Sequence, residues 1–365
     1  MPKQVLIWPS PWDYRLKNGL FSQGFSLRGA FQRAFQLWQT AATAAGFELN
    51  TWDMRPLESA DLLCFINLPK TRSELESARL KAPRAKTLLM VNESPLLAPA
   101  THEIANQALF DFVVTFTRKN CDNWRVFPYR LPLTRQFPAR NPKYSQRKIL
   151  GMVNTNRVEG FWAVRQRGAT GLPGIGPLLG GWHLSPFELW KIYQNDLYAV
   201  RRDLVREAGR FDSPVMEVFG KGWNGEQISW CPLYRNRPYQ AWRKAFVEDK
   251  VDVLSDYRFC LAFENFRGSL DYVDVKVFDG LLAGSVPVYL GEEQITDFLP
   301  ATAFVDARNF RTHRELLAYL NSCPEPEWAA MREAGQQFLK SEAFTPFSDE
   351  AFAEQMTEIL KKIIS

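Results

Sequence analysis

The feature that most constrains the fold of this chain is an alternation of short apolar runs with segments of helical periodicity. It occurs first within residues 1–145, where helices are expected at about 29–45 and 72–80. Apolar runs predict five strands there, at Gln4–Trp8, Phe47–Trp52, Leu62–Leu68, Thr87–Val91 and Asp111–Phe116. Strands that alternate with helices in this way build a parallel sheet with helices on both faces.

The same alternation occurs again after a polar stretch, residues 133–147, which carries two prolines and is expected to be a linker. Strands are expected at Lys148–Asn154, Val215–Phe219, Phe259–Phe263, Val286–Leu290 and Ala303–Val305. Helices are expected at Leu197–Glu207, Val275–Leu282, His313–Asn321 and Glu325–Ser341. The chain should therefore form two Rossmann-like α/β domains, 1–145 and 146–345, that face a cleft, followed by a helix within 346–365.

Two segments do not fit this alternation. Residues 157–195 are rich in Gly, Trp and Pro, and their glycines resemble the GxGxxG phosphate-binding pattern only loosely. They follow no clean strand-to-helix start, so we expect a loop insertion. Asp349–Ile364 has apolar residues at helical spacing. Packing on the core is the favoured interpretation of that helix, and peripheral contact with the inner face of a membrane is the alternative.

Charge and composition exclude several classes of protein. The net charge is +5, but Lys and Arg are scattered and form no long run, which argues against a nucleic-acid partner. An anionic substrate such as a nucleotide diphosphate explains the excess as well, and so does chance. No run of 18 apolar residues predicts an integral membrane segment. Five widely spaced cysteines and the lack of a signal-like start predict reduced thiols in a cytoplasmic protein.

The most informative segment for function is 257–291, which reads as a buried strand, a polar turn, a helix and a second buried strand. Glu264 and Asn265 are expected directly after the first strand, where ligands meet an open α/β sheet. Lys276 opens the helix, and a cation beside the N–H groups of a helix N-terminus suits a diphosphate. The alternatives are a buried structural role for Glu264, a turn role for Asn265 and a solvated Lys276.

This segment resembles the donor-binding motif of the α-1,3/4-fucosyltransferases, glycosyltransferase family ten, and of their bacterial members in particular. The family pattern reads roughly YKF-x-x-x-FENS, then DY-[VI]-TEK, then AVPV-x-x-G. Here it stands as Tyr257-Arg258-Phe259, Phe263-Glu264-Asn265, Asp271-Tyr272-Val273, Lys276 and Val286-Pro287-Val288. Order and spacing hold apart from one extra residue between Asn265 and Tyr272.

Weaker matches extend the resemblance to about residues 60–310, with 157–195 as an insertion. Glu93-Ser94-Pro95 follows the fourth expected strand, as ESP follows a strand in that family. Asn154, Arg201 and Val218-Phe219-Gly220 resemble its SN, AR-x-x-Y-V and VDVYG elements.

The resemblance implies a GT-B enzyme that transfers fucose from GDP-fucose to a hydroxyl of a glycan acceptor, with inversion and without a metal. It implies that Glu93 is the general base, although an acidic residue before Ser-Pro can also cap a helix. Arg201 and Lys276 would neutralise the diphosphate, and Asn265 and Tyr272 would hold the nucleotide sugar. The sequence has no DxD triplet and its three histidines do not cluster, so no metal and no other cofactor is expected.

One departure puts the donor in question. Val275 stands where the family has a ribose-binding Glu, and the adjacent Asp274 is expected to point elsewhere on the helix unless the extra residue shifts the turn. A transferase for another nucleotide sugar is therefore an alternative. A non-catalytic carbohydrate- or nucleotide-binding protein is a second one, against which Glu93 argues, because a binder needs no base.

Overall fold

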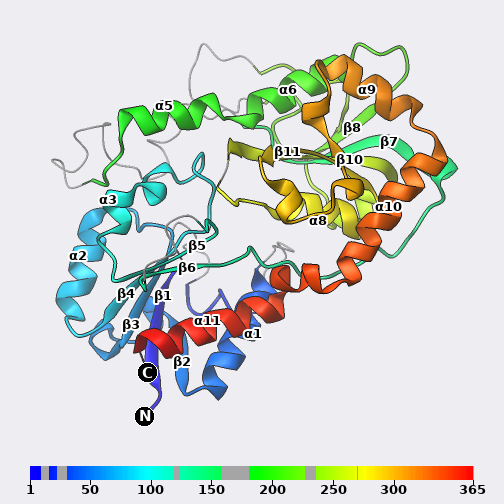
Figure 1. Cartoon of the computed structure of the whole chain (residues 1–365). Coiled ribbons are helices and arrows are strands. Elements are labelled where there is room, and N and C mark those ends of the chain that lie inside the picture. Colours follow the sequence, from blue (N-terminus) through cyan, green and yellow to red (C-terminus); the bar gives the residue numbers. More distant parts are fainter. Residues whose placement is uncertain are drawn as a thin grey trace.

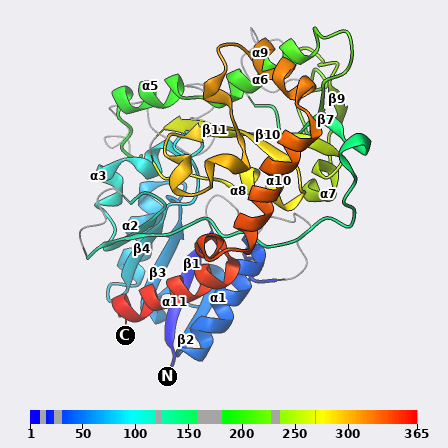
Figure 2. The ribbon, with the colours of Figure 1, turned by 45° about the vertical axis from the view of Figure 1, so that its right-hand side comes forward.

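A computed structural model shows two parallel β-sheets, one after the other in the chain, each flanked by helices (Figures 1 and 2). The structure describes residues 1–9, 16–22, 31–118, 124–157, 181–226, 236–268 and 270–364. The expected division into two α/β sheets is confirmed. The candidate site described below lies at the carboxyl ends of the strands of both sheets.

The first sheet has six strands in the order β2-β1-β3-β4-β5-β6, all parallel. They are β1 (Lys3–Trp8), β2 (Phe47–Thr51), β3 (Leu62–Ile66), β4 (Lys86–Met90), β5 (Phe112–Thr115) and β6 (Val126–Pro128). The five strands expected from apolar runs are present. The sixth, β6, was not expected, because three half-buried residues at a sheet edge leave no pattern. The order of strands reverses between β1 and β3.

The second sheet also has six parallel strands, in the order β12-β11-β10-β7-β8-β9. They are β7 (Lys148–Val153), β8 (Met216–Phe219), β9 (Trp242–Lys244), β10 (Tyr257–Gly268), β11 (Val286–Glu292) and β12 (Val305–Asp306). Counted from β7, this is the 3-2-1-4-5-6 order of dinucleotide-binding folds, whose switch point lies between β7 and β10. Glu264 and Asn265, expected after the strand, are its late residues, beyond the last regular pair Phe263↔Leu290.

Ten helices are described, and most lie where periodicity predicted them. They are α1 (Gln32–Ala44), α2 (Arg72–Lys81), α3 (Ile104–Gln107), α5 (Pro186–Gln194), α6 (Leu197–Ala208), α7 (Lys250–Leu254), α8 (Val275–Leu282), α9 (His313–Ser322), α10 (Glu325–Lys340) and α11 (Asp349–Ile364). The expectation of a loop throughout 157–195 was wrong, because α5 occupies its last part. That helix begins at a proline, which suits a first helical position, and it contains no glycine. Residues 158–180 lie outside the described part.

The C-terminal helix packs on the first sheet although it follows the second one. Figures 1 and 2 show α11 beside α1, and the two helices are in contact. Its apolar face, including Met356 and Leu360, is buried in the core that β1, β3 and β4 share. This agrees with the core-packing interpretation of that helix. Among the described helices, none is long and apolar enough to cross a membrane.

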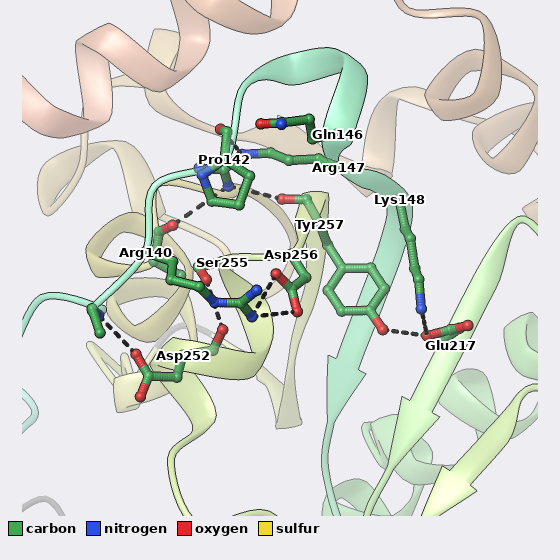
Figure 3. Close-up of polar contacts among 12 residues, drawn as sticks. Arg140, Pro142, Gln146, Arg147, Lys148, Glu217, Asp252, Ser255, Asp256 and Tyr257 are labelled. Carbon is green, nitrogen blue, oxygen red and sulfur yellow. Dashed lines mark hydrogen bonds and ion pairs between the residues drawn. The ribbon is translucent and has the colours of Figure 1, made fainter.

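The connection between the sheets is anchored at the amino ends of β7 and β10 (Figure 3). Arg140 donates to both carboxylate oxygens of Asp256 at 2.9 Å. The buried Arg147 guanidinium donates to the carbonyls of Tyr257, at 3.1 Å, and Gly284, at 2.9 Å. These bonds tie the linker to the start of the second sheet.

Candidate functional site

A cavity of about 940 Å³ lies between the carboxyl ends of the two sheets. The first sheet contributes Glu93, which follows β4, and α1 contributes Gln32 and Gln36. The second sheet contributes the segments after β7, β8 and β9 and the start of α8, namely Asn154, Thr155, Gly220, Lys250, Asp274 and Lys276. Strand ends at a topological switch point are where open α/β sheets bind ligands, so this cavity is the candidate site.

Glu93 is half-buried at a bend two residues after Val91, and it lines the cavity. Burial, with the Glu93 charge as a further cause, raises the pKa of the Tyr129 hydroxyl well above its ordinary value. The pKa of Tyr272 is raised in the same way, first by burial and then by Asp274, Glu264 and Glu93. Glu93 of the first domain therefore lies close enough to Tyr272 of the second domain for its charge to contribute to the raised pKa of that residue.

Lys276 lies against two carboxylates at the start of α8. Its Nζ is 3.3 Å from Oε2 of Glu264 and also contacts Oδ2 of Asp274. Burial opposes the charge of Lys276, but the two carboxylates raise its pKa above the ordinary range. Burial raises the pKa of Glu264 to about 7, against the opposing effect of Lys276. The charge of this cluster therefore depends on pH in the neutral range.

The N-terminus of α8 is already capped, which the sequence did not predict. The Asp274 side chain accepts from the backbone N–H of Val275 at 2.7 Å, and its own N–H donates to Oε1 of Glu264 at 2.9 Å. Val275 is buried, with its side chain in the apolar cluster under α8. Asp274 is thus committed to the helix end and to Lys276, and Val275 offers no polar group.

Arg201 and Asn265 form a buried pair next to the cluster of Glu264, Asp274 and Lys276, which the sequence resemblance assigns to the donor and which is called the donor cluster below. Nη2 of Arg201 donates to Oδ1 of Asn265 at 2.8 Å, and the guanidinium lies 4.2 Å from the centre of the Tyr198 ring. Burial lowers the pKa of Arg201, against the attraction of Tyr198, Asp196 and Glu264. Its Nη1 is buried and has no partner among the described residues. An unpaired charged donor of this kind calls for an anionic or carbonyl ligand.

Tyr272 crosses from the second sheet into the core of the first. Its ring packs edge-on against Phe116 with centroids 4.9 Å apart. The preceding Asp271 accepts from the backbone N–H of Arg118 at 2.7 Å and from its Nη2 at 2.7 Å. Arg118 also reaches Asp297, at 3.0 Å. This contact fixes the donor motif against the first sheet.

The structure therefore brings Glu93, Asp274 and Lys276 to one cavity, with Glu93 on the side of the first sheet and the other two on the side of the second. Glu264, Asn265 and Arg201 are buried and do not line that cavity. Tyr272 lies in the interface between the sheets. Sequence reasoning missed Lys250 as a cavity residue, and it missed the Arg118–Asp271 contact. Asn154 and Gly220 were noted only as parts of motifs. Among the described residues, no group of three or more His, Cys, Asp or Glu side chains could hold a metal ion.

Comparison with known proteins supports the predicted resemblance. Residues 215–363 match the family model described as "Glycosyltransferase family 10 (fucosyltransferase) C-term". A "Putative fucosyltransferase-like protein" of Arabidopsis thaliana is 52% identical over 54 residues, 15% of this chain and 10% of that protein. "Alpha-(1,3)-fucosyltransferase 7" of Homo sapiens is 41% identical over 81 residues, 21% of this chain and 23% of that protein. The chain thus spans less than a quarter of the length of these relatives.

Solved structures extend the likeness to the whole fold. A crystal structure titled as an alpha1,3-fucosyltransferase with GDP aligns with a TM-score of 0.52 and 16% identity, covering 99% of this chain and 91% of that one. Anabaena Alr3699/HepE, in complex with UDP and glucose, aligns with a TM-score of 0.53 and 10% identity, covering 99% and 100%. At these identities the likeness is one of fold, and it confirms the predicted GT-B architecture.

Proposed function

We propose, from the match of residues 215–363 to the family model of the family 10 glycosyltransferases, that this chain is an inverting fucosyltransferase that uses GDP-fucose without a metal. The acceptor is a hydroxyl group of a glycan. The second domain, residues 146–345, holds the donor, and the first domain, residues 1–145, holds the acceptor.

One observation carries this proposal: a single cavity is lined by Glu93 from the first sheet and by Asp274 and Lys276 from the second. Transfer needs a base for the acceptor hydroxyl and, opposite it, positive charge for the leaving diphosphate. Both lie at strand ends that face each other. A protein that only binds sugar or nucleotide has no need for a base on the acceptor side.

The residues have the following roles in the reaction. Glu93 takes the proton of the acceptor hydroxyl as that oxygen bonds to the anomeric carbon of the donor. The bond from the same carbon to the diphosphate oxygen breaks, and GDP leaves with the electron pair. Lys276 and the unpaired Nη1 of Arg201 stabilise the charge that develops on the diphosphate. Attack from the side opposite to the leaving group inverts the anomeric carbon.

A second candidate donor is favoured by the start of α8. Val275 is apolar and Asp274 is occupied by the helix end and Lys276, so neither offers a ribose contact in this conformation. A nucleotide sugar with another base or sugar is then the alternative substrate for the same cavity and the same base.

Hydrolysis and transfer assays with GDP-, UDP- and CMP-sugars, in buffer with EDTA, test the proposal. We expect turnover with GDP-fucose and thermal stabilisation by GDP without added metal. Turnover with only a UDP- or CMP-sugar would assign the alternative donor. Binding of nucleotide sugars with no turnover of any of them, or dependence on Mg²⁺ or Mn²⁺, would contradict the proposal.

A further inference from the structure

The backbone of the base segment, Val91–Glu93, is held by side chains from elsewhere in the first domain. We propose that Asn67 and His102 are positioning residues that fix this segment so that Glu93 meets the acceptor hydroxyl. This inference rests on the proposed function, because it concerns how the base is held.

Asn67, at the end of the neighbouring strand β3, accepts two hydrogen bonds from the backbone of the base segment. It directly follows β3, and its Oδ1 accepts from the backbone N–H groups of Asn92, at 3.0 Å, and Glu93, at 3.1 Å. Two N–H donors pointing at one atom require it to be the amide oxygen, so the orientation of the side chain is determined. Asn67 takes a left-handed conformation, with φ 57°, which Asn tolerates better than most residues. The residue is buried, so these bonds are shielded from water.

His102 holds the other side of the same residue. Its Nε2 lies 2.8 Å from the backbone oxygen of Glu93. Because a carbonyl only accepts, Nε2 carries the hydrogen and donates it. Burial lowers the pKa of His102 to about 4, although the bond to Glu93 opposes this, so the ring is neutral at neutral pH. The ring also packs on Phe116, with centroids 5.6 Å apart, and Phe116 in turn contacts Tyr272.

Tyr129 completes the restraint one residue earlier. Its hydroxyl donates to the backbone oxygen of Val91 at 2.9 Å and lies 3.3 Å from Oδ1 of Asn92. Val91 N–H itself donates to the oxygen of Val114, which extends the sheet. The backbone on both sides of the Glu93 Cα is thus fixed by hydrogen bonds from three elements of the first domain.

The consequence is kinetic rather than one of donor affinity. A carboxylate at the end of a bend loses its alignment when the bend shifts, and a displacement of about 1 Å can cost on the order of 10²-fold in rate. Asn67 and His102 belong to the first domain and are not among the residues that line the cavity next to Lys276. Their loss should therefore leave the binding of the donor intact. A purely structural role would instead lower stability and donor binding together.

The first test removes the Asn67 grip. Asn67→Gly keeps the left-handed backbone and deletes both bonds, and we expect kcat to fall about 10- to 100-fold with the Kd for GDP unchanged within about threefold. Asn18→Gly is the matched control. Asn18 is also left-handed, and its Oδ1 accepts from the N–H of Thr51, the last residue of β2, at 2.7 Å rather than from the base segment. We expect this control to keep wild-type kcat.

The second test uses a pair of variants at His102. His102→Gln can still present an N–H to the oxygen of Glu93, whereas His102→Phe keeps the ring and cannot. We expect His102→Phe to lower kcat about tenfold or more and His102→Gln to stay within about threefold of wild type. His102 variants also keep the proposal testable should Asn67→Gly fail to fold.

Glu93→Gln in the same assay separates this inference from the proposed function. If Glu93→Gln abolishes turnover while Asn67→Gly and His102→Phe turn over at the wild-type rate, the positioning roles are wrong and the base stands. Equal losses in His102→Gln and His102→Phe would also overturn the inference. If Glu93→Gln itself is active, the proposed base fails first.

Discussion

Gly220→Ala is expected to destabilise the second domain strongly, because the donor side of the cavity is built on a close approach of two backbone segments. Gly220 follows β8 with φ +131°, a conformation that L side chains rarely adopt. A Cβ there would lie 2.1 Å from the oxygen and 2.7 Å from the carbonyl carbon of Asn154. Backbone strain of this type costs about 1–3 kcal/mol, and because the obstacle is backbone the strand ends must also separate.

We therefore expect a loss of about 3 kcal/mol, which for a domain of this size lowers Tm by roughly 6–12 °C. Scanning calorimetry measures it. Gly209→Ala is the matched control, since a Cβ at that glycine meets its nearest atom, the oxygen of Arg206, only at 3.4 Å. Its Tm should stay within about 2 °C of wild type. Because Asn154 lines the cavity, Gly220→Ala should also weaken binding of GDP. A Gly220→Ala protein with the Tm of the control would refute this reasoning.

Four further outcomes follow from the charges of the site and of the contact between the sheets. Protonation of Glu264, whose pKa is about 7, makes the donor cluster more positive. Calorimetry should therefore show that GDP-fucose binds more tightly at pH 6 than at pH 8. The variant Glu264→Gln should abolish that dependence. The same shift makes the free energy of unfolding depend on pH. Relative to Glu264→Gln, the wild type should lose stability as the pH rises from the ordinary pKa of Glu, 4.5, to the raised pKa of about 7, and the difference should stay constant above that. Lys276→Met should weaken GDP binding without metal about tenfold or more, whereas a Kd within about twofold would place the diphosphate elsewhere. Asp271→Asn should lower the free energy of unfolding by about 1–2 kcal/mol, measured by thermal denaturation, a modest loss because its partner Arg118 is half-exposed. An unchanged Tm would show that this contact does not hold the sheets together.

The elements that sequence predicts well are those whose burial is continuous. Leu62–Ile66 and Lys86–Met90 are central strands of a parallel sheet, buried on both faces except at the Lys86 end, and such strands read as unbroken apolar runs. The edge strands Val126–Pro128 and Trp242–Lys244 are short and only partly buried, so no apolar run marks them. Gly and Pro in 157–195 likewise concealed the helix Pro186–Gln194.

The site shows the same limit. Glu93 and Lys276 were found because each belongs to a local motif at a strand or helix end. The cap formed by Asp274 and the bond from Arg201 to Asn265 depend on which side chains meet across the fold, and spacing does not encode that. Asn67 is separated from Glu93 by 26 residues. Its signal, an Asn directly after a strand, is too common to be read without the structure.

The most direct measurement of the central claim is the single-turnover rate of Glu93→Gln with saturating GDP-fucose and an acceptor glycan. The amide keeps the shape of the carboxylate and removes its basicity, and losing such a base costs about 10²–10⁴-fold in rate. The account predicts that loss together with an unchanged Kd for the donor, because the contacts proposed for the diphosphate lie on the second sheet and not at Glu93. A Glu93→Gln rate within about threefold of wild type, roughly 0.65 kcal/mol of barrier, would contradict it.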